Sequence, residues 1–109
     1  MRKISLILLL CLFPAKESNA YWLDGNHWYA VCFHGENEFM NYFMEGVGET
    51  EEVFSVTGHP FFCVPNGVTL RQLSDIFCNY LAEHPESRQY QGASLAMGAL
   101  AEKFPCSSH

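Results

Sequence analysis

The clearest structural signal in the chain is the stretch from Thr69 to Glu83, which reads TLRQLSDIFCNYLAE. Thr69 and Gln72 form a capping-box pattern, in which each side chain pairs with the backbone N–H group of the other residue at the start of a helix. Apolar residues then recur at helical spacing, at positions 70, 73, 76, 77, 80 and 81. The pattern predicts an amphipathic helix from about Thr69 to Glu83, which ends before Pro85.

Outward from this helix, three further segments have helical patterns. They are Asn26 to Phe33, Asn37 to Phe54, and a last segment that opens at Pro85 and ends near Phe104. Glycines and prolines predict a loop from Ser55 to Val68, and Val53 to Val56 is the one piece whose composition suits an extended strand. The predicted fold is all-α, a small bundle of four to five short helices.

Glycines occur inside two of these helices. Gly46 and Gly48 in the second helix each cost up to about 1 kcal/mol relative to alanine. Two alternative explanations fit these glycines: close backbone contact with a neighbouring helix, or fraying near the end of the helix. The last helix is rich in glycine and alanine, so we expect it to lie close against its neighbours.

The N-terminus has the order of a secretory signal. Arg2 and Lys3 precede an apolar run from Ile4 to Phe13, and small residues follow up to Ala20. A membrane anchor would need about 20 consecutive apolar residues, roughly twice the length of this run. We therefore expect residues 1–20 to be a cleaved signal peptide and residues 21–109 to be one soluble, exported domain without a membrane anchor.

Five cysteines are present, and Cys11 lies within the predicted signal. The other four are Cys32, Cys63, Cys78 and Cys106. An even number of cysteines in an exported chain predicts two disulfides. Four cysteines allow three pairings, and the residues alone do not rank them. Each bridge matters because a domain of this size buries only a modest core.

Signal removal leaves three basic residues, Arg71, Arg88 and Lys103, against eleven acidic ones, and hence a formal net charge of −8. This charge repels nucleic acid and anionic lipid, so nucleic-acid binding is excluded, and it attracts cationic partners. Solubility alone is the simpler explanation of the acidity.

A catalytic or metal site would have to combine the cysteines with histidines. The histidines near them are His27, His34, His59 and His84. None forms a recognisable nucleophile signature with a cysteine, and no Cys-x-x-Cys pair supports a zinc site. We therefore expect no enzymatic activity, no metal and no cofactor.

The C-terminal half carries a series of motifs in a fixed order. They are Phe62-Cys63-Val64-Pro65-Asn66-Gly67-Val68-Thr69, Tyr80-Leu81 with His84-Pro85, Ala99-Leu100 and Phe104-Pro105-Cys106. This series resembles the Rap/Tai family, periplasmic immunity proteins that protect bacteria from type VI secretion peptidoglycan amidases. Upstream, Phe39-x-x-Tyr42-x-x-Gly46 is more weakly similar to the second-helix pattern of that family.

One departure from the family bears on the disulfides. Members usually carry a cysteine directly after the phenylalanine of the second-helix pattern, where this chain has Met40. This chain instead has a cysteine at position 78, where the family tends to place an aliphatic residue. The resemblance therefore favours the pairs Cys63–Cys106 and Cys32–Cys78, with the third helix tied to the first.

The resemblance implies a binding protein, a homodimer that occludes the active site of a cognate amidase effector. The turn from His84 to Gln91 is the expected point of insertion. The candidate partner-binding residues are Glu83, Glu86, Ser87, Arg88 and Tyr90 at this turn, with Glu51 and Glu52 from an acidic series in the second helix. An ordinary connection between helices and a solvated helix face are the simpler interpretations.

Two other function classes fit the compartment. Small helical periplasmic chaperones of the acid-stress type share the size and disulfides, but they are rich in lysine, and this chain keeps only Lys103 after cleavage. A cell-wall enzyme would need a nucleophile constellation that the sequence lacks. Aggregation assays at low pH and genomic adjacency to an amidase gene separate these alternatives from the immunity function.

Overall fold

The computed structural model describes residues 23–35 and 37–107. The predicted signal peptide, residues 1–20, lies outside this part of the chain, as does the predicted mature terminus at Tyr21. Within the described residues, no helix combines the length and apolar character needed to cross a bilayer.

The first two helices follow closely on each other. Helix α2 spans Gly25–His34, and its N-cap is Asp24, whose side chain accepts a hydrogen bond from the His27 N–H at 2.9 Å. Helix α3 then spans Asn37–Val56. The prediction of an extended segment from Val53 to Val56 is therefore wrong. Helical hydrogen bonding continues through both valines despite their preference for strands.

Helix α4 spans Leu70–Glu83 and begins as the sequence predicts. Gln72 N–H donates to the Thr69 hydroxyl at 3.2 Å, and the Thr69 N–H donates to the Gln72 side chain at 2.7 Å, which confirms the capping box. The predicted last helix is divided in two: a short 3₁₀ helix, η1, spans Pro85–Ser87, and α5 spans Gly92–Lys103.

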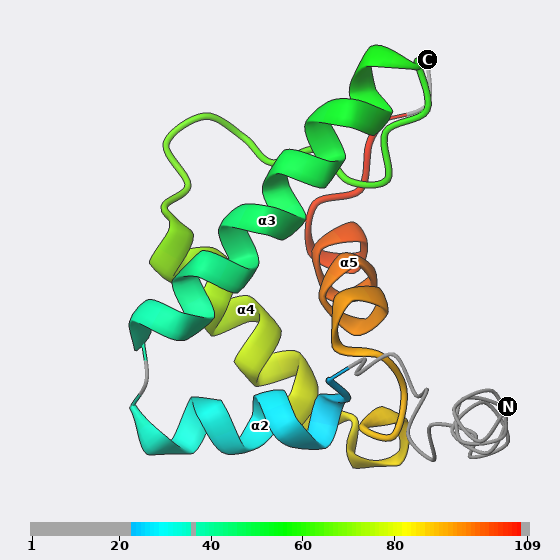
Figure 1. Ribbon diagram of the computed structural model, residues 1–109. Helices are drawn as coiled ribbons and strands as arrows, with labels where there is room; N and C mark the ends of the chain where they lie inside the picture. The colour runs from blue at the N-terminus through cyan, green and yellow to red at the C-terminus, as the bar shows by residue number, and fades with distance from the viewer. Residues whose placement is uncertain (1–22, 36, 108–109) are drawn as a thin grey trace, which may run out of the picture.

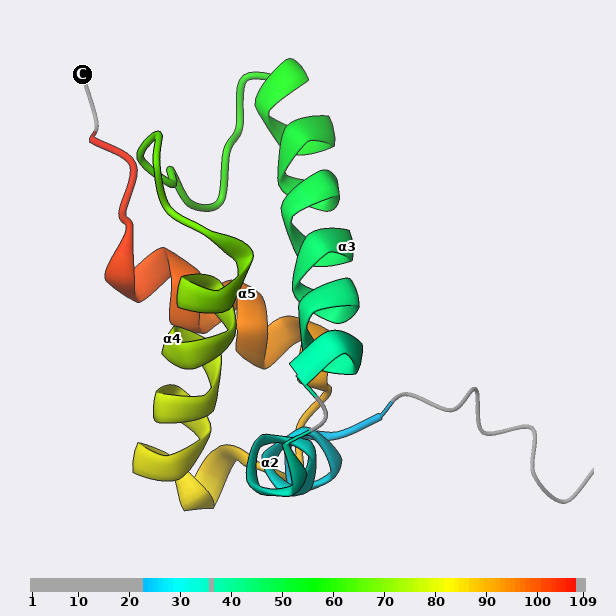
Figure 2. The same cartoon turned by 90° about the vertical axis from the view of Figure 1, so that its left-hand side faces the viewer.

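The four α-helices of the described residues enclose one apolar core, which confirms the all-α bundle. Helix α2 lies across one end of the bundle, α3 rises from it along one side, and α4 and α5 pack beside each other (Figures 1 and 2). The Trp28 ring stacks on Phe43 with centroids 4.0 Å apart. Met40 and Met44 are both buried, so these methionines belong to the core.

Two disulfides are present among the described residues, and they have the pairing that the resemblance favours. Cys32 of α2 is bonded to Cys78 of α4, and Cys63 in the α3–α4 loop is bonded to Cys106 after α5. The Cys63 N–H also donates to the Phe104 carbonyl at 2.8 Å. The C-terminal segment therefore lies beside the loop that follows α3 (Figure 1).

Close backbone contact occurs at glycines other than those expected. A side chain added at Gly46 or Gly48 would meet no atom within 4 Å, so close helix contact does not explain these residues. A side chain at Gly92 would instead overlap the Trp28 indole, and one at Gly25 would lie 2.8 Å from the Arg88 Cα. The backbone at the start of α2 therefore lies close to the α4–α5 connection and the start of α5.

Candidate functional site

The turn between α4 and α5, residues 84–91, is held to α2 by main-chain hydrogen bonds. The Gly25 N–H donates to the Tyr90 carbonyl, and the Asn26 N–H donates to the Arg88 carbonyl, each at 2.9 Å. The N–H groups at the start of a helix have no partner within the helix, and here the turn supplies it. The α4–α5 turn therefore has a defined backbone conformation before any partner binds.

The Arg88 side chain stabilises this turn by hydrogen bonds to the end of α4. Its Nε donates to the Leu81 carbonyl at 2.7 Å and its Nη2 to the Ala82 carbonyl at 3.3 Å, so it satisfies carbonyls at the C-terminal end of α4. Its guanidinium also lies 3.5 Å from the centroid of the Tyr29 ring, a cation–π contact. Arg88 was predicted as a partner contact, but its side chain is half-buried and makes these contacts within the protein.

Three of the predicted contact residues at this turn have exposed side chains. Glu83 and Glu86 are exposed, and Tyr90 keeps 58% of its surface accessible. Ser87 is half-buried, and its N–H donates to the His84 carbonyl at 3.0 Å. The structure thus brings a large aromatic side chain and two carboxylates to the surface of a fixed turn.

The two acidic residues predicted in the second helix have different surroundings. Glu51 is only 8% exposed, and its carboxylate accepts hydrogen bonds from the Phe61 N–H at 3.0 Å and the Ser55 hydroxyl at 3.3 Å. Glu52 is exposed. The solvated face predicted for this series therefore excludes Glu51, which holds the following loop against α3.

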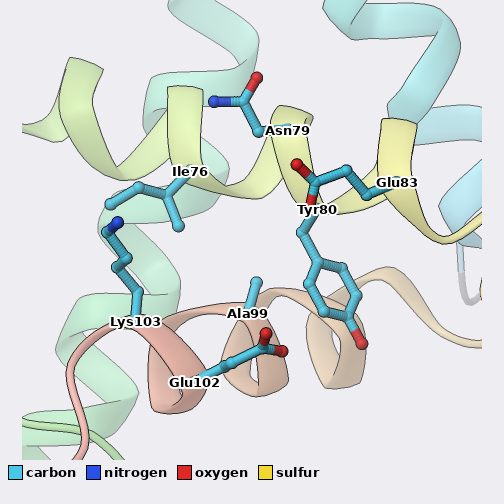
Figure 3. A pocket seen from close by; sticks show the side chains of 7 residues that line it. All are labelled: Ile76, Asn79, Tyr80, Glu83, Ala99, Glu102 and Lys103. Atoms are coloured by element: carbon cyan, nitrogen blue, oxygen red, sulfur yellow. The ribbon is translucent and has the colours of Figure 1, made fainter.

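A hollow of about 270 Å³ lies between α4 and α5, next to the turn. It is lined by Ile76, Asn79, Tyr80, Glu83, Ala99, Glu102 and Lys103. The Tyr80 ring lies between the two helices, and Lys103 extends from α5 toward Ile76 of α4 (Figure 3). Glu83 lines the hollow and is the last residue of α4, so the hollow adjoins the turn.

Of the residues considered for catalysis, the four cysteines and His84 have structural roles. The four cysteines of the described chain are all in disulfides, so none offers a thiol nucleophile. His84 stacks on Tyr80 with ring centroids 4.0 Å apart, and its Nδ1 lies 2.8 Å from the Tyr80 carbonyl oxygen. Over residues 23–35 and 37–107, no three metal-ligating side chains gather closely enough to hold an ion.

Comparison with known families decides the class of this protein. A family model described as Rap1a immunity proteins matches residues 24–106. The chain belongs to this family. The match covers every helix described above, both disulfides and the α4–α5 turn. Separate searches of curated proteins and of solved structures found no match.

Membership of the Rap1a family supports the role of an immunity protein, a class that binds a cognate effector. Sequence reasoning found the turn but missed the hollow, with Tyr80 on one wall and Glu102 and Lys103 on the other. The three-residue spacing of Tyr80 and Glu83 indicates that they share a helix face. No pattern in the sequence near Tyr80 and Glu83 indicates that α5 packs against this helix face.

Proposed function

We propose that this Rap1a family member is a periplasmic immunity protein that binds a type VI secretion peptidoglycan amidase and occludes its active site. Three features support the proposal. The family is one of immunity proteins, the two disulfides suit an oxidising compartment, and an exposed, fixed turn is available for insertion. The predicted signal peptide would deliver the chain to the compartment where the amidase acts.

The conformation of the α4–α5 turn is the observation that carries this proposal. An inhibitory loop that is ordered before binding loses less conformational entropy in the complex, and so binds more tightly. Tyr90 is an apolar anchor with a polar end, the kind of residue that dominates binding energy in protein interfaces. Glu83, the last residue of α4, and Glu86, in the turn, can pair with basic groups around an enzyme cleft.

We also propose that the protein acts as a homodimer, as the resemblance to the Rap/Tai family implies. Phe33 at the end of α2 is 70% exposed and Tyr42 of α3 is 71% exposed. Large exposed aromatic side chains are enriched in protein interfaces, which makes this corner the candidate dimer contact. Analytical ultracentrifugation of the wild type and of a Phe33→Ser, Tyr42→Ser variant tests it.

Calorimetric titration against purified amidase effectors of the same bacterium tests the inhibitory function. We expect tight binding and loss of peptidoglycan cleavage with the wild type. Tyr90→Ala should weaken binding by about 30-fold, the effect of losing roughly 2 kcal/mol at an interface anchor. Glu86→Lys should weaken it further when combined with Tyr90→Ala.

Arg88→Ala provides the structural control for that experiment. Since Arg88 caps α4 and packs on Tyr29, its loss should lower the thermal midpoint, whereas Glu86→Lys and Tyr90→Ala should leave the midpoint unchanged. Wild-type protein that binds no amidase would refute the proposed function. Wild-type binding that survives both surface substitutions would instead move the contact away from the turn.

A further inference from the structure

A second and larger depression lies along α3, beside the start of α4. This groove has a volume of about 950 Å³. It is lined by Glu45, Gly48, Glu49, Glu51, Glu52, Ser55 and Val56 of α3, and by Phe62, Cys63, Val64, Leu70 and Leu73 of the facing loop and α4. We refer to it as the α3 groove.

The floor and one lip of the α3 groove are apolar. Phe62 and Leu73 are 2% and 7% exposed and form part of the core, while Val64 is half-buried. Val56 is 89% exposed at one end, and Leu70 is 38% exposed at the start of α4. Apolar surface is therefore continuous from the core to the solvent, as in grooves that receive an apolar side chain from a partner.

The other lip is strongly acidic. Glu45, Glu49 and Glu52 are exposed on the helix that forms this wall. Glu45 and Glu49 stand one helical turn apart, where like charges mildly destabilise a helix. Of the described residues that line the groove, none is a lysine, an arginine or a histidine. The lip thus presents uncompensated negative charge next to an apolar surface.

This combination selects one class of occupant. A segment that carries lysine or arginine beside apolar side chains matches both the acidic lip and the apolar floor. A second copy of the predicted mature chain, residues 21–109, does not supply it, because Arg71 and Lys103 are isolated bases and Arg88 is engaged in the α4–α5 turn. A single metal ion does not fit either, since no ligand cluster is present among the described residues.

We infer that the α3 groove is a second contact site for the effector, which receives a basic amphipathic segment of that protein, separate from the contact at the α4–α5 turn. This inference rests on the proposed function for the identity of the partner. The groove lies on α3 and the start of α4, whereas the turn follows the end of α4, so one effector would contact two sites at opposite ends of α4.

The first experiment tests the groove without the effector. The full chain is exported to the periplasm, purified with its disulfides intact and labelled with ¹⁵N. The probe is a synthetic helix of about three turns with lysines along one face and leucines along the other, and the control peptide has glutamate for lysine. We expect saturable amide shifts at Glu49, Glu52, Val56 and Leu70 with the lysine peptide only.

Charge reversal on the acidic lip supplies the matched comparison. Glu49→Lys with Glu52→Lys should weaken peptide binding by about tenfold or more, because it reverses the attraction at the lip. Glu38→Lys with Asp75→Lys changes the net charge equally at exposed positions outside the groove lining. Equal effects of the two pairs, or amide shifts spread over the whole surface, would overturn the groove as a site.

The second experiment repeats both pairs with the amidase found by calorimetry. We expect the groove pair to weaken amidase binding about tenfold more than the control pair. If the wild type binds the amidase but the two pairs behave alike, the proposed function holds and the groove contact is refuted. If the peptide binds in the groove but no amidase binds the wild type, the groove stands and its assignment to the effector fails.

Discussion

The two connections at the ends of α4 are held in different ways. The α4–α5 turn, residues 84–91, is fixed by main-chain hydrogen bonds to α2 and by the Arg88 side chain. The α3–α4 loop, residues 57–69, is longer and mostly exposed. It is attached through the buried Phe62 side chain, the Glu51 carboxylate and the Cys63–Cys106 disulfide.

This difference shows which kind of substitution each connection tolerates. The turn depends on the absence of side chains at Gly25 and Gly92, because its backbone lies against α2. The loop depends on a few side chains that attach it at separate points. We therefore expect the turn to be sensitive to added atoms and the loop to be sensitive to deleted ones.

The largest expected effect is the loss of the disulfide at the loop. Cys63→Ala with Cys106→Ala opens a cross-link between residues 43 positions apart, which should lower the free energy of unfolding by about 4 kcal/mol on the chain-entropy model. Urea denaturation of the oxidised wild type and the variant measures the difference. Proteolysis of the variant should begin in the α3–α4 loop.

Cys32→Ala with Cys78→Ala gives the matched control for that measurement. These residues are separated by 46 positions, so the entropic effect on the unfolded chain is nearly the same. Any difference between the two variants then reports on the folded state. A loss below about 1 kcal/mol for the loop disulfide would mean that Phe62 and Glu51 alone hold the loop in place.

A smaller loss is expected from adding one methyl group at the start of α5, directly after the turn. Gly92→Ala places a Cβ against the Trp28 indole, whose ring is already stacked on Phe43, and should destabilise the protein by about 2 kcal/mol. Gly98→Ala in the same helix is the control, since its Cβ meets no atom within 4 Å. There the change should stabilise by up to about 1 kcal/mol. Thermal unfolding of both variants checks the opposite signs.

Local patterns in the sequence predicted much of the fold. The start of α4 was predicted correctly because a capping box involves only Thr69 and Gln72, three residues apart. The end of α3 was not, since the preference of Val53 and Val56 for strands is weaker than the hydrogen bonding of a helix that has already formed. The favoured disulfide pairing came from family resemblance, because the spacing of cysteines does not determine it.

The candidate site was predicted less completely, for a related reason. The α4–α5 turn was found from Pro85 and the polar residues around it, but the internal role of Arg88 depends on where Tyr29 lies, far away in the sequence. Glu51 is similar, because its partner is the backbone of Phe61, ten residues later in a loop. Burial of a charged side chain is decided by tertiary packing, which the local pattern of charges does not contain.

The smallest expected effect comes from deleting the Glu51 attachment of the loop. Glu51→Ala removes two hydrogen bonds to a carboxylate and leaves the Phe61 N–H without its partner, so we expect a loss of about 1.5 kcal/mol. Glu52→Ala, one residue on and exposed, should change stability by less than about 0.5 kcal/mol. Hydrogen exchange at the Phe61 amide separates a local effect from a global one. Faster exchange at Phe61 with unchanged exchange in α4 and α5 would show that the carboxylate stabilises the loop only locally. Equal effects of the two substitutions would show that Glu51 contributes no more to stability than an ordinary surface glutamate.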